Sequence, residues 1–146
     1  MLGGGDQRGL PSLAEANGLP GDERPPAALL VGYDVLGGLF ELNGPDPAAA
    51  GRPGDPGEVC YFGPDTLDWE ALGAGHGAWL SWIAGGGTAE FYQALRWPAW
   101  REETRRPPLT HGIAVYPFLS TREAQADLAA TTRSPVPMAE LESLQR

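Results

Sequence analysis

Two closely spaced apolar runs constrain the fold of this chain more than any other feature. The first, LLVGYDVLGGLFELNG, covers residues 29–44, and the second, EVCYFGPDTLDW, covers residues 58–69. Gly37-Gly38 divides the first run and can supply the positive φ values that a tight hairpin turn needs. The pattern predicts strand, turn, strand, loop and strand, which is the centre of a small antiparallel sheet.

The rest of the chain adds a fourth strand and several short helices to this centre. Strands are expected at 28–34, 39–43, 58–62 and 112–118, with a loop at 43–57 that holds four Pro and four Gly. Helices are expected after the capping residues Asp65 or Thr66, Thr88, Ser120 and Ser134, and at 78–84. The predicted fold class is α+β, an antiparallel sheet of about four strands with short helices packed on one side.

Two of the expected helices involve specific apolar side chains. The first is a short turn that would run through Asp68, Trp69 and Leu72. The second is the final helix, in which Met138, Leu141 and Leu144 recur at helical spacing. Such spacing is typical of an apolar stripe that packs on a core.

The division of the chain follows from its Gly and Pro content. Residues 1–26 hold ten of the 36 Gly and Pro and show little periodicity. We expect residues 1–26 to be a poorly structured N-terminal lead and residues 27–146 to form a single α+β domain. The 43–57 loop belongs to that domain.

Charge and cysteine content exclude several functional classes. Nineteen acidic residues against ten arginines give a net charge of −9, whereas nucleic acid and anionic membranes require a basic surface. The single cysteine, Cys60, lies in an apolar run and is expected to be buried rather than reactive. With no secretion signal and no disulfide framework, the chain is predicted to be cytoplasmic, and its oligomeric state stays open.

No motif specifies a reaction, a metal or another cofactor. The glycine triplets lack the strand–helix context of a phosphate site, and the two histidines, His76 and His111, lack zinc-ligand spacing. Asp34 and Asp65 could act as general acid and base on one rim of the sheet, together with one of the histidines. The competing interpretation is structural: Asp34 prepares the hairpin turn and Asp65 caps a helix.

The tryptophans suggest a binding surface instead. Trp97 and Trp100 bracket a Pro that ends a helix, and an indole at such a corner often packs inward while its N–H faces a partner. Core packing is the alternative for both. We therefore predict a protein-binding surface made of Trp97, Trp100, Asp65, Asp68 and Tyr33.

Several blocks of the sequence resemble an uncharacterised bacterial family, domain-of-unknown-function family 2625. They are D-V-L-G-G at 34–38, F-x-P-D-T-L-x-W at 62–69 and R-W-P-x-W at 96–100. The resemblance covers roughly residues 10–146 and implies no reaction, cofactor or catalytic residue. It also implies a further N-terminal part in family members, so that this chain would be a form without it.

A more distant resemblance links the strand and turn YFGPDTLDW to the immunity and cell-wall-regulator superfamily related to Smi1/Knr4, whose members neutralise toxins or act as adaptors. This likeness concerns the fold only. Three hypotheses follow. The chain is a soluble, non-enzymatic protein-binding module, with an immunity-type toxin-neutralising protein as one form of it; or a hydrolase that uses Asp34 and Asp65; or a structural or regulatory subunit from a truncated gene.

Overall fold

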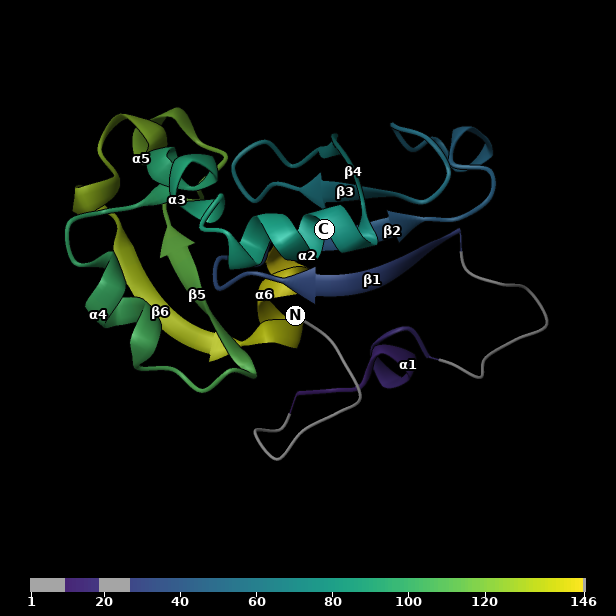
Figure 1. The fold of residues 1–146 in the computed structure, drawn as a ribbon. Helices are drawn as coiled ribbons and strands as arrows, with labels where there is room; N and C mark the ends of the chain where they lie inside the picture. The colour runs from purple at the N-terminus through teal and green to yellow at the C-terminus, as the bar shows by residue number, and fades with distance from the viewer. Residues whose placement is uncertain (1–9, 19–26, 146) are drawn as a thin grey trace.

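A computed structural model describes residues 10–18 and 27–145 of the chain (Figure 1). Within them, the strands are β1 (Ala28–Tyr33), β2 (Leu39–Asn43), β3 (Glu58–Phe62), β4 (Trp69–Gly75), β5 (His111–Tyr116) and β6 (Thr132–Pro137). The α-helices are α1 (Leu13–Ala16), α2 (His76–Ala84), α3 (Thr88–Phe91), α4 (Trp100–Arg105), α5 (Arg122–Ala126) and α6 (Met138–Gln145). Single 3₁₀ turns lie at Ala48–Ala50, Gln93–Leu95 and Leu128–Ala130.

The first four strands form one antiparallel sheet in the order β1-β2-β3-β4. The β1–β2 register runs from Ala28 opposite Asn43 to Tyr33 opposite Leu39, and Gly37 in the connecting turn has φ 85°. The predicted hairpin and third strand are therefore confirmed, as is the α+β fold class.

The fourth strand of this sheet is not the predicted one. Residues 69–75, where the sequence indicated a helical turn, form β4 and pair with β3, with Trp69 opposite Phe62. Helix is disfavoured here because Gly73 has φ 72° and glycine is a poor helix former. The free edge of β3 offers main-chain partners instead.

The strand predicted at 112–118 belongs to a second, two-stranded sheet. It corresponds to β5, which pairs with β6 over its whole length, Ile113 lying opposite Pro135. The helix predicted to open at Ser134-Pro135 is therefore wrong at its start, and α6 begins at Met138. Proline is tolerated in β6 because an edge strand need not donate every backbone N–H.

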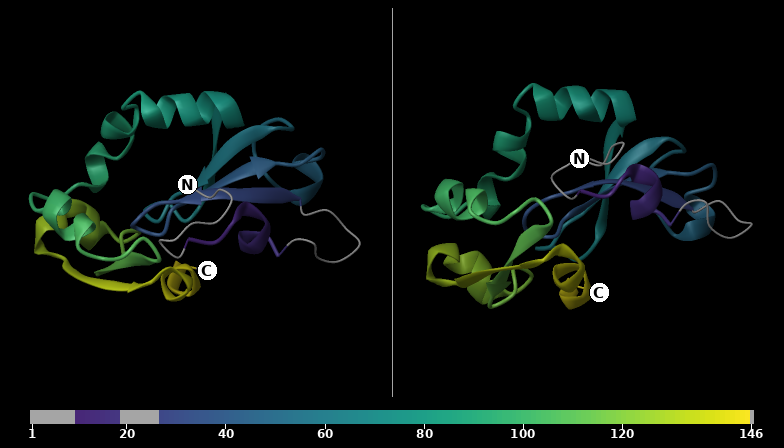
Figure 2. Two further views of the ribbon diagram at one scale, coloured as in Figure 1. Left: turned by 60° about the horizontal axis from the view of Figure 1, so that its bottom comes forward. Right: turned by 90° about the horizontal axis from the view of Figure 1, so that it is seen from below.

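Helix α2 covers one face of the four-stranded sheet (Figure 2). Trp79 of α2, 2% exposed, packs with buried side chains of three strands: Val31, Phe40, Val59 and Tyr61. The 43–57 loop folds against β2 and β3. The buried thiol of Cys60 donates to the Pro53 carbonyl at 3.4 Å, and Arg52 pairs with Glu41 at 2.8 Å.

A second core cluster lies between β5 and the segment that carries α4. It consists of Leu36, Trp97, Ile113, Val115 and Leu119. Leu36 comes from the β1–β2 turn, so this turn leaves the first sheet and inserts into the second core. The N–H of Ile113 donates to the Val35 carbonyl at 2.6 Å, and Gln145 Nε2 donates to the Leu36 carbonyl at 2.9 Å.

Part of the predicted lead is structured. Ser12 and Glu15 form a capping box at the start of α1, and the Asn17 amide bonds both the N–H and the carbonyl of Leu30. The remaining lead, residues 1–9 and 19–26, lies outside the described residues. Within the described ranges, no helix is both long enough and apolar enough to cross a bilayer.

Candidate functional site

The Asp34 carboxylate is the centre of a hydrogen-bond network that has four donors. Its Oδ1 accepts the N–H groups of Leu36 at 3.0 Å and Gly38 at 2.8 Å. Its Oδ2 accepts the hydroxyls of Tyr61 at 2.7 Å and Tyr92 at 2.9 Å. One side chain thus fixes the β1–β2 turn, β3 and the segment after α3.

The surroundings keep both tyrosines protonated. Burial raises the pKa of Tyr61 and of Tyr92 far above the usual value, and the neighbouring Asp34 charge raises each further. A protonated phenol can donate to Asp34 whereas a phenolate cannot. Gly38 leaves the room that this network needs, since a Cβ at this position would clash with Asp34 Oδ2 and the Tyr61 hydroxyl.

This geometry gives Asp34 a structural role. A carboxylate has about four lone-pair sites, and four donors of the chain occupy those of Asp34. A general base needs a free site that can accept a proton from a substrate. The predicted function of Asp34 in preparing the hairpin turn is confirmed by its bonds to Leu36 and Gly38.

No hydrogen bond among the described residues joins Asp34, Asp65 and a histidine, as the hydrolase hypothesis would require. His76 is exposed and stacks on Trp79, with 5.6 Å between ring centroids. His111 and Asp34 do line one cavity of about 150 Å³, but the ring Nδ1 of His111 lies 3.1 Å from Thr110 Oγ1. No hydrogen bond joins a histidine to a carboxylate in this part of the chain. The side chain of Asp65 lies beside Gly63.

The corner at Trp97 and Trp100 is more closed than the predicted binding surface requires. Trp97 is only 3% exposed, and its indole N–H donates to Glu103. Arg133 pairs with the same carboxylate at 2.8 Å, and the hydrogen bond from Arg133 lowers the pKa of Glu103. The N–H of Trp97 is therefore used inside the chain, so Trp97 does not fit its predicted contact with a partner.

Trp100 is half-buried and covered by charge. The guanidinium carbons of Arg96 and Arg101 lie 4.0 and 5.3 Å from the centre of its ring. Both tryptophans line a cavity of about 120 Å³ together with Leu36, Tyr92 and Thr104. The corner thus has a small internal space but offers little open aromatic surface.

The predicted binding residues line two adjoining cavities, which share Asp34, Val35 and Thr104, or lie in the β3–β4 turn. Trp97 and Trp100 line the corner cavity. Tyr33 lines the cavity of His111, and burial, then Glu142, raises its pKa. Asp65 and Asp68 lie elsewhere, in the turn between β3 and β4. Only these two acids lie next in sequence to residues of the apolar groove, Pro64 and Leu67.

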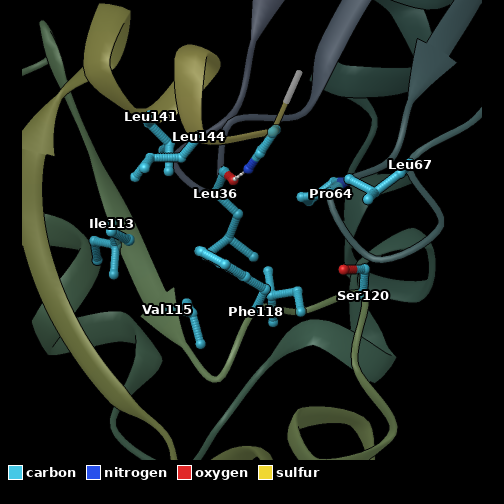
Figure 3. A pocket seen from close by; sticks show the side chains of 12 residues that line it. Leu36, Pro64, Leu67, Ile113, Val115, Phe118, Ser120, Leu141 and Leu144 are labelled. Atoms are coloured by element: carbon cyan, nitrogen blue, oxygen red, sulfur yellow. Dashed lines mark hydrogen bonds between the residues drawn. The ribbon is translucent and has the colours of Figure 1, made fainter.

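An apolar groove lies where the β3–β4 turn, β5 and α6 meet (Figure 3). It encloses about 70 Å³. Leu141 and Leu144 of α6 lie on one side, Pro64 and Leu67 on another, and Leu36 between them. Ile113, Val115, Phe118 and Leu119 complete its apolar lining.

Three side chains of this groove are unusually open to solvent for their size. Leu67 is 45%, Phe118 49% and Leu144 48% exposed. The adjacent Tyr116, 68% exposed, packs edge-on against Phe118. Large apolar side chains gathered around a concavity are typical of a binding surface rather than of chance exposure.

Leu67 also has an unusual backbone. Its φ is 53°, the one positive value of a non-glycine residue in the described ranges. Leucine rarely adopts this left-handed conformation, which costs about 1–2 kcal/mol. A glycine would meet the turn geometry without that cost. The leucine side chain is therefore present at the groove despite a cost to folding.

Sequence reasoning missed the groove. Leu144 was predicted to belong to the buried stripe of the last helix, and only Met138 and Leu141 of that stripe are buried. The sequence feature that could have indicated the groove is Leu67, a large apolar residue between Thr66 and Asp68 in a turn. Among the described residues, no group of three or more metal-ligating side chains gathers at one point, and the groove lining is apolar rather than ligating.

The sequence model of one family, described as "Protein of unknown function DUF2625", matches residues 1–141. The chain belongs to this family. The predicted resemblance to domain-of-unknown-function family 2625 is therefore confirmed, and it assigns no activity.

Two curated relatives carry equally general descriptions. The first is the "Putative uncharacterized protein YbfG" of Escherichia coli K12, 37% identical over 118 residues, which are 81% of this chain and 50% of the relative. The second is an "Uncharacterized protein" of Haemophilus influenzae, 34% identical over 82 residues, or 56% of this chain and 33% of the relative. The chain thus spans at most half the length of these relatives. No solved structure matches it.

Proposed function

We propose that this chain is a non-enzymatic protein-binding module whose contact surface is the apolar groove between the β3–β4 turn, β5 and α6. The observation that supports it most is the exposure of Leu67, Phe118 and Leu144 around one concavity. Burial of apolar area contributes about 25 cal/mol per Å², so three such side chains provide the core of a contact.

The chemistry of the other candidate residues supports binding over catalysis. The carboxylate of Asp34 is occupied by four donors. The groove is lined mainly by leucine, isoleucine, valine, proline and phenylalanine, which supply no nucleophile, acid or base. An immunity-type role would be one case of this function, with a toxin as the partner.

A peptide selection tests the proposal. Short random peptides displayed on phage are selected on the immobilised wild-type chain. Each enriched peptide is then measured against Leu144→Ser and Phe118→Ser. The proposal expects peptides whose affinity drops at least about tenfold in both variants, as for anchors at the centre of an interface.

Leu109→Ser is the matched control. Leu109 is 47% exposed, as open as the groove residues, but it does not line the groove. Peptides from the selection should keep their affinity for this variant. If no enriched peptide distinguishes Leu144→Ser from Leu109→Ser, the groove is not a protein-binding surface and the proposed function is wrong.

A further inference from the structure

We infer that the groove accepts an apolar segment of another protein that carries basic residues beside its apolar anchors, and that Asp65 and Asp68 receive those bases. The inference rests on the proposed function and adds the charge of the partner. It commits to a segment of a different protein rather than to a second copy of this chain.

The two acids are placed on either side of an apolar anchor. Asp65, half-buried, and the exposed Asp68 flank Leu67 in the β3–β4 turn. The side chain of Leu67 lines the groove, and the same turn carries Asp65 two residues before it and Asp68 one residue after it, outside the lining itself. Charged residues around an apolar centre steer a partner of opposite charge and fix its orientation.

Neither carboxylate is neutralised by an arginine of the described chain, although the Asp65 charge also helps to raise the pKa of Tyr61. Within the described ranges, neither Asp65 nor Asp68 forms an ion pair. One oxygen of Asp68 accepts the N–H of Trp69 at 2.8 Å, which leaves its other acceptor sites open. The carbonyl of Asp65, not its carboxylate, accepts Gln125 Nε2 at 3.4 Å.

Most arginines of the described chain are engaged elsewhere. Arg52, Arg106 and Arg133 pair with glutamates, and Arg96 and Arg101 cover Trp100. Among the described residues, the arginine closest in sequence to the groove lining is the exposed Arg122, two residues after Ser120 and one turn before Gln125 on α5. It makes no ion pair with Asp65 or Asp68.

A second copy of the chain is a poor occupant for the same reason. In a symmetric contact, both copies would bring the same acids to the same place. The net charge of −9 adds repulsion between copies. A partner segment with Arg or Lys next to leucine, isoleucine or aromatic anchors complements both the lining and the edge of the groove.

The test uses the peptides selected on the wild-type chain, synthesised with a fluorophore. We expect them to combine apolar anchors with one or two bases. Replacing those bases by Gln should weaken binding about threefold to tenfold at low salt, and the loss should shrink as salt is added. Asp65→Asn/Asp68→Asn should weaken the parent peptide by the same factor without changing the affinity of the Gln peptide.

Two further variants separate charge from shape. Arg122→Gln removes the exposed base of α5 and should raise the affinity for the basic peptide, whereas the two aspartate changes should lower it. Leu67→Gly should weaken the basic and the Gln peptides alike, since it removes the anchor that both use. Thermal melts of every variant, read alongside, show that these changes act on the folded chain.

The outcomes distinguish the two ideas. Groove-dependent peptides that are acidic or neutral, or that bind Asp65→Asn/Asp68→Asn as tightly as wild type, overturn the inferred partner charge and leave the groove as a binding surface. Absence of any groove-dependent peptide overturns the proposed function and this inference with it. A dimer in sedimentation experiments that Leu144→Ser abolishes would replace the partner by a second copy.

Discussion

The four-stranded sheet with α2 and the β5–β6 sheet with α6 differ in how completely their apolar faces are covered. In the first region, Trp79 of α2 closes the core over three strands. The second region contains four of the five large hydrophobics that are exposed in the described chain, namely Leu109, Tyr116, Phe118 and Leu144. The fifth, Leu67, belongs to the first region but lines the groove between the two.

This difference indicates that the two regions have different roles. A two-stranded sheet is at best marginally stable alone, so β5 and β6 depend on the β1–β2 turn, which delivers Leu36 and the Asp34 network. The first region supplies stability, and the second supplies an incompletely covered apolar surface.

Asp34→Ala should be the most damaging change, because it leaves two buried tyrosine hydroxyls and two turn amides without their acceptor. We expect a loss of about 4 kcal/mol in the free energy of unfolding, measured by urea denaturation. Asp46→Ala is the control, since Asp46 accepts one exposed N–H, that of Ala49 at 3.2 Å. A loss for Asp34→Ala no larger than that of the control would contradict its role as the link between the regions.

Two leucines on consecutive turns of α6 differ in how far they are buried. Leu141, 3% exposed, should cost about 3 kcal/mol when changed to Ala, because the change leaves a cavity. Leu144, 48% exposed, should cost less than about 0.5 kcal/mol. Chemical denaturation of both variants measures the contrast. Equal losses would show that Leu144 is a core residue and that the groove is closed in solution.

Arg52→Met probes the covering of the first sheet by the 43–57 loop. Arg52 and Glu41 are 11% and 17% exposed, and Arg52 Nε also donates to Asn43 at 2.9 Å. Removing the base leaves a largely buried carboxylate, so we expect a loss of about 2 kcal/mol. Arg106→Met breaks a pair of two side chains that are about 70% exposed and should change stability by less than about 0.5 kcal/mol. Thermal unfolding of the two variants compares these effects, and similar melting temperatures would refute the difference.

Alkaline pH should lower the free energy of unfolding, because Tyr61 and Tyr92 ionise in the unfolded chain while the Asp34 network keeps them protonated in the folded chain. The pKa values of Tyr61 and Tyr92 are raised in the folded chain, so their contribution is complete below the unfolded value near 10 and is lost as pH rises above it. At half a pH unit above 10 we expect a loss of about 1–2 kcal/mol. Tyr92→Phe should reduce the slope of stability against pH, which urea titrations at several pH values would measure. An unchanged slope would count against a raised pKa at Tyr92.

The smallest expected effect has the opposite sign. Leu67→Gly relieves a φ of 53° and should leave stability unchanged or raise it by up to about 1 kcal/mol. Leu109→Gly, at an exposed leucine without a positive φ, should lower stability slightly or not at all. Differential scanning calorimetry compares the two. A clear loss for Leu67→Gly would mean that the leucine is needed for folding rather than for the groove.

The predictions from sequence succeeded where a local pattern decided the structure. Asp34 and Gly37 specify the β1–β2 turn within five residues, and the helix predicted at 78–84 lies within α2. They failed where a distant partner decided. Residues 69–75 become a strand because they pair with the free edge of β3. Ser134-Pro135 lies in a strand because these residues pair with the free edge of β5. Exposure of Leu144 depends likewise on what the rest of the fold leaves uncovered.

Periodicity, turn residues and charge, which are properties of neighbouring residues, determined the hairpin, the third strand, the buried cysteine and the acidic character of this protein. The tertiary structure alone decided that Tyr61 and Tyr92 meet on Asp34, that Trp97 is closed in by Glu103 and Arg133, and that Leu67, Phe118 and Leu144 surround one groove. Contacts between residues far apart in the chain depend on how all the elements pack together, and hydrophobic burial has no direction that a short stretch of sequence can encode.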